Sequence, residues 1–261
     1  MPDTKVPDKK APVSSLVKAL RVLDSFSLEQ PEQGVTEIAE RLGIHKSTVY
    51  NILTTCEAMG YVQQDPHTRR YRLGLHILRL GQVVREGMDL RRVVVPVMER
   101  VRDYYREAVH FAVELNGQVV YLETVQPLER SVASLAVGKS AYMHCTGVGK
   151  AILAHMSPER MHAVISEQGM AQYTQNTITD LAELEIELEK IRRQGYAVDN
   201  MEYEWGIRCI AVPIRNEIGV VHASMSISGP SERLPLEAIA EMAQPLMHFG
   251  ADISKRFGWL R

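Results

Sequence analysis

Long apolar segments and paired cysteines are both missing from this sequence of 261 residues. No apolar run approaches the roughly 18–20 residues that a helix needs to cross a bilayer, and the polar start lacks the apolar region of a secretory signal. Cys56, Cys145 and Cys209 lie far apart and form no CxxC motif, which argues against a disulfide framework and indicates a reducing compartment. We therefore expect a cytoplasmic protein with no membrane partner.

The net charge is also small, at −2, with 30 Lys and Arg against 32 Asp and Glu. A nearly neutral chain has no overall attraction to nucleic acid, so any DNA binding must come from a local motif. The hydrophobic fraction of 45% and the charged fraction of 24% are ordinary for folded proteins. They exclude a disordered, collagen-like or coiled-coil chain, and the length fits one large domain or two modest ones.

Enzyme and metal motifs are absent as well. The sequence has no P-loop, no dinucleotide fingerprint after a strand, no GxSxG elbow, no HExxH and no CxxC pair. Five residues would be the candidate ligands of a metal, but their spacing does not favour one: His110, His144, Cys145, Cys209 and His222. We therefore expect no metal, no cofactor and no catalytic residue.

Two glutamates near an arginine have a structural interpretation. Glu202 and Glu204 precede Arg208 closely enough to predict an ion-pair network, which we favour over a general-acid pair. The two function classes differ in a simple test, because an enzyme would turn over a small acid and a sensor would return it unchanged.

The most informative segment covers residues 35–54, where two short helices are predicted over 35–42 and 47–59. A helix-turn-helix needs a small residue where the helices meet and a turn residue that tolerates positive φ, and Ala39 and Gly43 meet these needs. Val49 and Ile52 are spaced to face back onto the first helix. The alternative is a purely structural three-helix unit with a solvated polar face, preceded by a helix capped at Ser14 or Ser15.

A hairpin with clustered arginines favours the DNA-binding interpretation. Residues 61–63 and 70–73 alternate like strands around a turn at 65–68, as in a wing that straddles the DNA backbone. On the second helix, Asn51 could read adenine in the major groove, and Lys46 suits a phosphate. The predicted DNA-binding residues are Thr36, Lys46, Ser47, Thr48, Tyr50, Asn51, Arg69 and Arg70.

The N-terminal part is only locally basic. Residues 1–72 hold ten Lys and Arg against nine Asp and Glu, so we expect modest affinity for each monomer. Dimerisation would bring two half-sites about one helical turn apart. An amphipathic helix over 73–87, with Leu75, Leu78, Leu80 and Val83 on it, is predicted to pair protomers together with the region of Leu90.

The remainder is predicted as mixed α and β structure. Asn116-Gly117 is a strong type I′ turn signal for a hairpin, and a second hairpin is predicted across residues 216–219. The predicted elements are strands at 110–115, 118–125, 131–137, 209–214 and 220–228, and helices at 90–105, 147–156, 158 onwards, 181–194 and 235–257.

Several segments together resemble the IclR family of bacterial transcription regulators. They are residues 34–39, 45–50, 60–62, 71–74, 147–151, 176–179, 195–199, 206–211 and 226–230. The resemblance implies an α+β chain: a tail at 1–13, a winged helix-turn-helix at 14–73, a linker helix at 74–88 and a GAF-like α/β effector domain at 89–261. It also implies a homodimer or a dimer of dimers. One departure concerns the recognition helix, where relatives often carry Arg and this chain has Asn51.

The resemblance also implies a site for a small carboxylate in the C-terminal half. Independently, Gly147-Val148-Gly149 precedes a predicted helix, whose N-terminus would attract an anion. The predicted effector-binding residues are Arg130, Ala133, Gly147, Val148, Asp199, Cys209, Ser226 and Ser228. Arg130 could clamp a carboxylate or could be a strand-end arginine in solvent. The alternating serines and Cys209 are equally typical of a half-buried strand.

These observations predict a sequence-specific transcription regulator that binds a palindromic operator in double-stranded DNA and responds to a small organic acid. Repression is preferred over activation. Two alternatives stay open: an effector-binding module whose helix-turn-helix mediates protein contacts, and an activator of a catabolic operon.

Overall fold

The structure, a computed structural model, describes residues 13–27, 30–87, 90–127 and 137–258. The chain divides into two units, Met1–Met88 and Asp89–Arg261, and each has a hydrophobic core of its own. None of the helices in the described ranges is long and apolar enough to span a bilayer.

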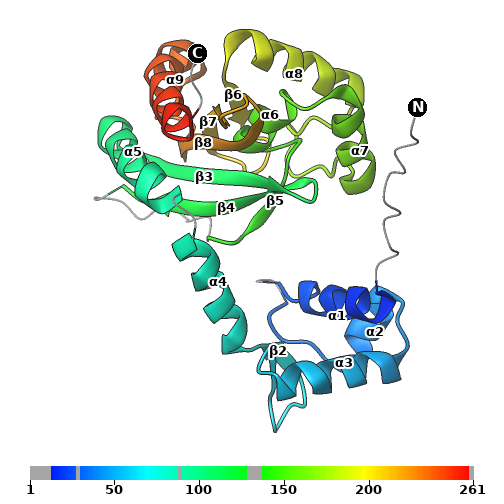
Figure 1. Ribbon diagram of the computed structural model, residues 1–261. Coiled ribbons are helices and arrows are strands. Elements are labelled where there is room, and N and C mark those ends of the chain that lie inside the picture. Colours follow the sequence, from blue (N-terminus) through cyan, green and yellow to red (C-terminus); the bar gives the residue numbers. More distant parts are fainter. Residues whose placement is uncertain (1–12, 28–29, 88–89, 128–136, 259–261) are drawn as a thin grey trace, which may run out of the picture. The chain divides into compact units, whose positions relative to one another are not determined.

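The first unit is a winged helix-turn-helix followed by one further helix (Figure 1). Its elements are α1 (Ser14–Asp24), α2 (Val35–Leu42), α3 (Lys46–Ala58), β1 (Val62–Gln64), β2 (Tyr71–Leu73) and α4 (Leu75–Gly87). The core of this unit contains Ile38 and Ala39 of α2, Val49 and Leu53 of α3, and Tyr71 of the hairpin. The predicted helical spacing on α2 and α3 is therefore confirmed.

Two predicted helix boundaries were wrong. Ser14 and Ser15 do not cap α1, because both are helical and the N-cap is Val13, which makes no side-chain cap. The helix predicted over 73–87 begins only at Leu75, since Leu73 is still paired with Val62 in the hairpin.

The second unit is a six-stranded antiparallel sheet with helices on both faces (Figure 1). The strands lie in the order β5-β4-β3-β8-β7-β6. Their bounds are β3 (Ala108–Leu115), β4 (Gln118–Val125), β5 (Ser140–Tyr142), β6 (Ala197–Asn200), β7 (Ile207–Arg215) and β8 (Val221–Pro230). The helices are α5 (Leu90–Tyr105), α6 (Gly147–Leu153), α7 (Pro158–Gln168), α8 (Leu181–Gln194), the 3₁₀ turn η1 (Leu236–Ala238) and α9 (Ile239–Arg256).

Side-chain alternation on the strands separates two cores. On β7, Ile210 and Val212 pack in a cluster with α5 and α9, whereas Ala211 packs in the other cluster with α6, α7 and α8. Successive strand residues point to opposite faces, so residues two apart share a face. This alternation decides which residues can line the pocket described below.

The predicted hairpin turn at Asn116-Gly117 is confirmed. Asn116 and Gly117 both have positive φ, at 53° and 81°, as a type I′ turn requires. Asp180 caps α8 by accepting a hydrogen bond from the Glu183 N–H. The helix expected over 147–156 ends at Leu153, because the chain must leave it before Ser157 starts α7 as N-cap. The strand predicted at 131–137 lies almost wholly outside the described residues, and β5 was not predicted.

Candidate functional site

The turn between α2 and α3 has the geometry of a helix-turn-helix. Gly43 ends α2 in the left-handed conformation with φ of 64°, and the Ile44 N–H bonds to the Ala39 carbonyl oxygen at 3.1 Å. Ala39 is 8% exposed, which confirms that this small side chain lies in the core where the helices meet.

One face of α3 is polar and open to solvent. Val49 and Leu53 are fully buried, and the residues between them on the other side are exposed. The predicted DNA-binding residues Lys46, Ser47, Tyr50 and Asn51 are exposed, Thr48 is half-buried, and Thr36 is exposed in the first turn of α2. Together they offer ammonium, hydroxyl and amide groups, which suit phosphate oxygens and base edges.

The hairpin that forms the wing is held by its own polar groups. The Asp65 carboxylate accepts hydrogen bonds from the N–H groups of His67 and Thr68, at 2.9 and 2.7 Å, which closes the turn. These bonds lower the pKa of Asp65. The adjacent Arg69 is exposed and has a positive φ of 57°.

Arg70, which was predicted to bind a phosphate, is bound within the first unit by hydrogen bonds to other residues. Its guanidinium donates to both carboxylate oxygens of Glu37, at 3.0 and 2.7 Å, and to the Glu32 carbonyl oxygen at 2.9 Å. Glu37 also accepts from the Gly34 N–H, and this bond, followed by Arg70, lowers the pKa of Glu37. Arg70 thus joins the wing to the start of α2.

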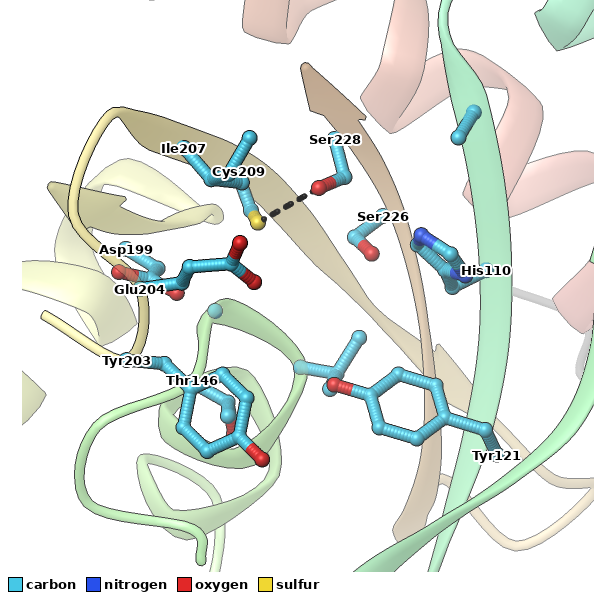
Figure 2. A pocket seen from close by; sticks show the side chains of 13 residues that line it. His110, Tyr121, Thr146, Asp199, Tyr203, Glu204, Ile207, Cys209, Ser226 and Ser228 are labelled. Atoms are coloured by element: carbon cyan, nitrogen blue, oxygen red, sulfur yellow. Dashed lines mark hydrogen bonds between the residues drawn. The ribbon is translucent and has the colours of Figure 1, made fainter. Parts of the chain in front are cut away.

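The second unit contains a pocket between the sheet and the start of α6 (Figure 2). Strand register explains its composition, because Asp199 lies opposite Cys209, Cys209 opposite Ser228, and Ser228 opposite Ala108. Residues directly opposite on neighbouring strands point to the same face. The next row on this face places Ser226 beside His110.

Predicted and unpredicted residues meet in this pocket. Six of the predicted effector residues line it: Gly147, Val148, Asp199, Cys209, Ser226 and Ser228. Arg130 and Ala133 lie outside the described residues. The remaining lining residues were not predicted for this site: Ala108, His110, Tyr121, Thr146, Tyr203, Glu204 and Ile207. Period-two alternation on β3 was the one available signal for Ala108 and His110.

The start of α6 approaches the sheet closely. A Cβ on Gly147 would lie 3.3 Å from the Cβ of Ala211, and one on Gly149 would lie 2.4 Å from the Cα of Met143. The second distance is too short for any side chain, so glycine is required at position 149. Thr146 caps the helix by accepting from the Gly149 N–H at 3.2 Å, and its own hydroxyl donates to the Tyr142 carbonyl oxygen.

Burial sets the protonation of the pocket. It raises the pKa of Asp199 to about 7, with a further rise from the nearby Glu202 carboxylate. Burial also lowers the pKa of His110 to about 4 and raises that of Cys209. At neutral pH the imidazole is therefore uncharged, the thiol is protonated, and Asp199 is close to half protonated.

A buried ion pair lies beneath the pocket. Lys150 on α6, 1% exposed, donates to Oε1 of Glu202 at 2.5 Å, and the Glu202 N–H donates to Oδ1 of Asp199 at 2.7 Å. The predicted network between the glutamates and Arg208 was wrong. The Arg208 guanidinium donates instead to Asn200 Oδ1 and to the carbonyl oxygens of Ser231 and Leu234, because β7 directs it toward these loops.

The candidate metal ligands do not come together. Within the described ranges no group of three or more His, Cys, Asp or Glu residues could hold a metal ion. His110 and Cys209 line the pocket, whereas His144 Nε2 donates a hydrogen bond to the Ala171 carbonyl oxygen at 3.0 Å.

Comparison with known proteins agrees with this architecture. Residues 15–66 match the family described as IclR helix-turn-helix domain, and residues 82–255 match the family described as bacterial transcriptional regulator IclR, C-terminal. The HTH-type transcriptional regulator KdgR of Dickeya chrysanthemi is 32% identical over 95% of this chain and 81% of its own length. The transcriptional repressor IclR of Escherichia coli is 27% identical over 95% of this chain and 92% of its own.

A solved structure with a ligand is also similar. It is an IclR homologue from Microbacterium hydrocarbonoxydans in complex with 4-hydroxybenzoate, 29% identical, with a TM-score of 0.74 over 93% of this chain and 98% of its own. Two matching domains in order, an exposed helix-turn-helix and relatives similar along their length lead to one conclusion. The chain belongs to the IclR family of bacterial helix-turn-helix transcription regulators.

Proposed function

We propose that this regulator binds a palindromic operator and that a small organic acid in the pocket of the second unit controls its affinity for DNA. The pocket carries the proposal, because buried polar groups from five elements converge there beside the first residues of a helix. The Microbacterium homologue bound to an aromatic acid supports an acidic ligand. The repressor name of the Escherichia coli relative supports repression.

DNA contact is assigned to the exposed face of α3 and to the wing. Ser47, Thr48, Tyr50 and Asn51 would enter the major groove, with Asn51 reading a base edge. Lys46 and Arg69 would contact phosphates. Thr36 would contact the backbone from α2, and Arg70 would act through Glu37 by holding the wing in place.

Dimerisation is assigned to apolar residues that the first unit leaves exposed. These residues lie on α1 and α4: Leu16, Val17, Leu20, Leu75, Leu78, Leu80, Val83 and Val84. Leu75 is 82% exposed, which is unusual for leucine on an amphipathic helix without a partner. A dimer or a dimer of dimers would bury these side chains and set the spacing of two half-sites.

A ligand changes DNA affinity only if it binds the DNA-competent and incompetent arrangements differently. We infer that the acid shifts the spacing of the two wings in the dimer and is released unchanged, without enzymatic turnover. The three free cysteines, Cys56, Cys145 and Cys209, suit a reducing compartment and support a cytoplasmic sensor.

Sequencing of genomic fragments retained by the purified chain, at a salt concentration of about 0.15 M, tests the proposal. The expected result is a short palindrome whose half-sites lie about one helical turn apart. Asp199→Ala is expected to keep operator affinity and lose the response to small carboxylates. The absence of enriched fragments, with and without a panel of carboxylates, would contradict DNA regulation and favour a module for protein contacts.

A further inference from the structure

The polar lining of the pocket is acidic. Asp199 and Glu204 both line it, and the described lining residues include no lysine or arginine. In Figure 2 both carboxyl groups lie on the side of the cavity that Cys209 also lines. A carboxylate ligand placed here would meet another negative charge in a site of low dielectric constant, which is strongly unfavourable.

Among the residues that the structure describes, the groups around Asp199 do not remove this conflict. Oδ1 already accepts from the Glu202 N–H, and Lys150, whose charge lowers the pKa of Asp199, is held by the Glu202 carboxylate at 2.5 Å and lies 3.8 Å from Glu187. The other titratable groups facing Asp199 are neutral or acidic: Tyr121 on β4, Cys145 before α6, Tyr203 and Glu204 after β6, and Cys209 on β7, with His110 on β3 across the pocket. Lys139 lies above the Tyr203 ring, with Nζ 5.8 Å from its centroid.

We propose that the pocket takes up its carboxylate ligand together with one proton, which Asp199 carries so that its side chain donates a hydrogen bond to the ligand. The proton comes from solvent and no covalent bond in the ligand changes. The inference rests on the proposed function, since it presupposes an acid in this pocket. It makes Asp199 the residue whose protonation decides whether the site can bind the carboxylate ligand.

Protonation is accessible because burial raises the pKa of Asp199 to about 7. At pH 6 most molecules would hold the proton, and at pH 8.5 few would. If only the protonated form binds, affinity should fall about 30-fold between these two values. The cavity volume of about 40 Å³ favours a small acid, of two or three carbons, over a larger one.

Isothermal titration calorimetry, in which acetate, glycolate or pyruvate is added to the full chain, tests the inference. Measurements at pH 6 and 8.5, in buffers that differ in ionisation enthalpy, give the number of protons taken up. We expect nearly none at pH 6 and nearly one at pH 8.5, with the fall in affinity given above. Because Trp205 lies exposed beside pocket residues Glu204 and Ile207, its fluorescence offers a second readout.

Asp199→Asn provides the sharpest variant, since the amide can donate the hydrogen bond without a proton. We expect it to bind with the same affinity at both pH values and more tightly than the unmodified chain at pH 8.5. Glu204→Gln is the matched control, because it removes the exposed carboxyl of the same pocket and should keep the pH dependence.

Each failure has a distinct meaning. Binding that is equally tight at both pH values, with no proton uptake, would overturn the proton-linked inference alone. A pH dependence that persists in Asp199→Asn would overturn the role of Asp199. Failure of all three acids to bind at pH 6, by a chain that still binds its operator, would overturn the acid ligand of the proposed function and the inference with it.

Discussion

Replacing Lys150 by Met should destabilise the second unit by about 3–5 kcal/mol, the usual cost of leaving one partner of a buried ion pair alone. Lys150 is 1% exposed, the Glu202 side chain is 6% exposed, and their charged atoms lie 2.5 Å apart. At an effective dielectric constant of about 20, this distance corresponds to a gross attraction of roughly 7 kcal/mol, much of which offsets the desolvation of both ions. Methionine fills a similar volume, so little of the loss would come from a cavity.

The assay is urea unfolding of the full chain, followed by tryptophan fluorescence, since both tryptophans, Trp205 and Trp259, belong to the second unit. Lys190→Met is the matched control. Lys190 is 62% exposed and lies 3.5 Å from Glu187 in an i,i+3 pair, so its loss should cost less than about 0.5 kcal/mol.

The loss should depend on pH with a definite sign. Burial raises the pKa of Glu202, and Lys150 opposes that rise, so removal of Lys150 raises the pKa further. A carboxyl with a raised native pKa binds more protons when folded than when unfolded, and stability therefore falls as pH rises above the unfolded value. The variant should lose more stability at pH 8 than at pH 5, and Lys150→Met/Glu202→Leu should recover most of it. A loss below about 1 kcal/mol, independent of pH, would refute this reasoning.

Three further variants test the DNA-binding surface and the start of α6. Asn51→Ala should cost about 1–3 kcal/mol in operator affinity and relax base preference at one position, and equal loss on all DNA sequences in a gel-shift series would exclude base reading. Arg69→Ala should reduce the slope of log affinity against log salt by about one and leave stability unchanged. Arg70→Ala should instead lower the free energy of unfolding of the first unit by about 0.5–1 kcal/mol. Gly149→Ala should cost at least about 1–3 kcal/mol because its Cβ would meet backbone at 2.4 Å, whereas Gly81→Ala in α4, with nothing within 4 Å, should be neutral or stabilising in the same melts.

Local patterns were sufficient for the helix-turn-helix, whereas the six predicted residues of the pocket depended on the resemblance to the IclR family. Ala39 and Gly43 report a tight helix crossing because sterics at those two positions act over a few residues. Alternation along β8 placed Ser226 and Ser228 on one face, but only the register of β7 against β8 brings Cys209 to that face. Tyr121 and Tyr203 could not be found in this way, since they reach the pocket from β4 and from the loop after β6.

The amino-acid sequence by itself determined the family and the order of the two domains. It also determined which alternate residues of each pocket strand share a face, because all three depend on spacing along the chain. Only the tertiary structure decided the charge relations: that Arg70 is bound to Glu37, that Lys150 and not Arg208 neutralises Glu202, and that the described residues lining the pocket of Asp199 include no lysine or arginine. Strand register brings together residues that lie tens of positions apart in the sequence. Burial then removes water from their side chains, and this sets the charge that each one carries.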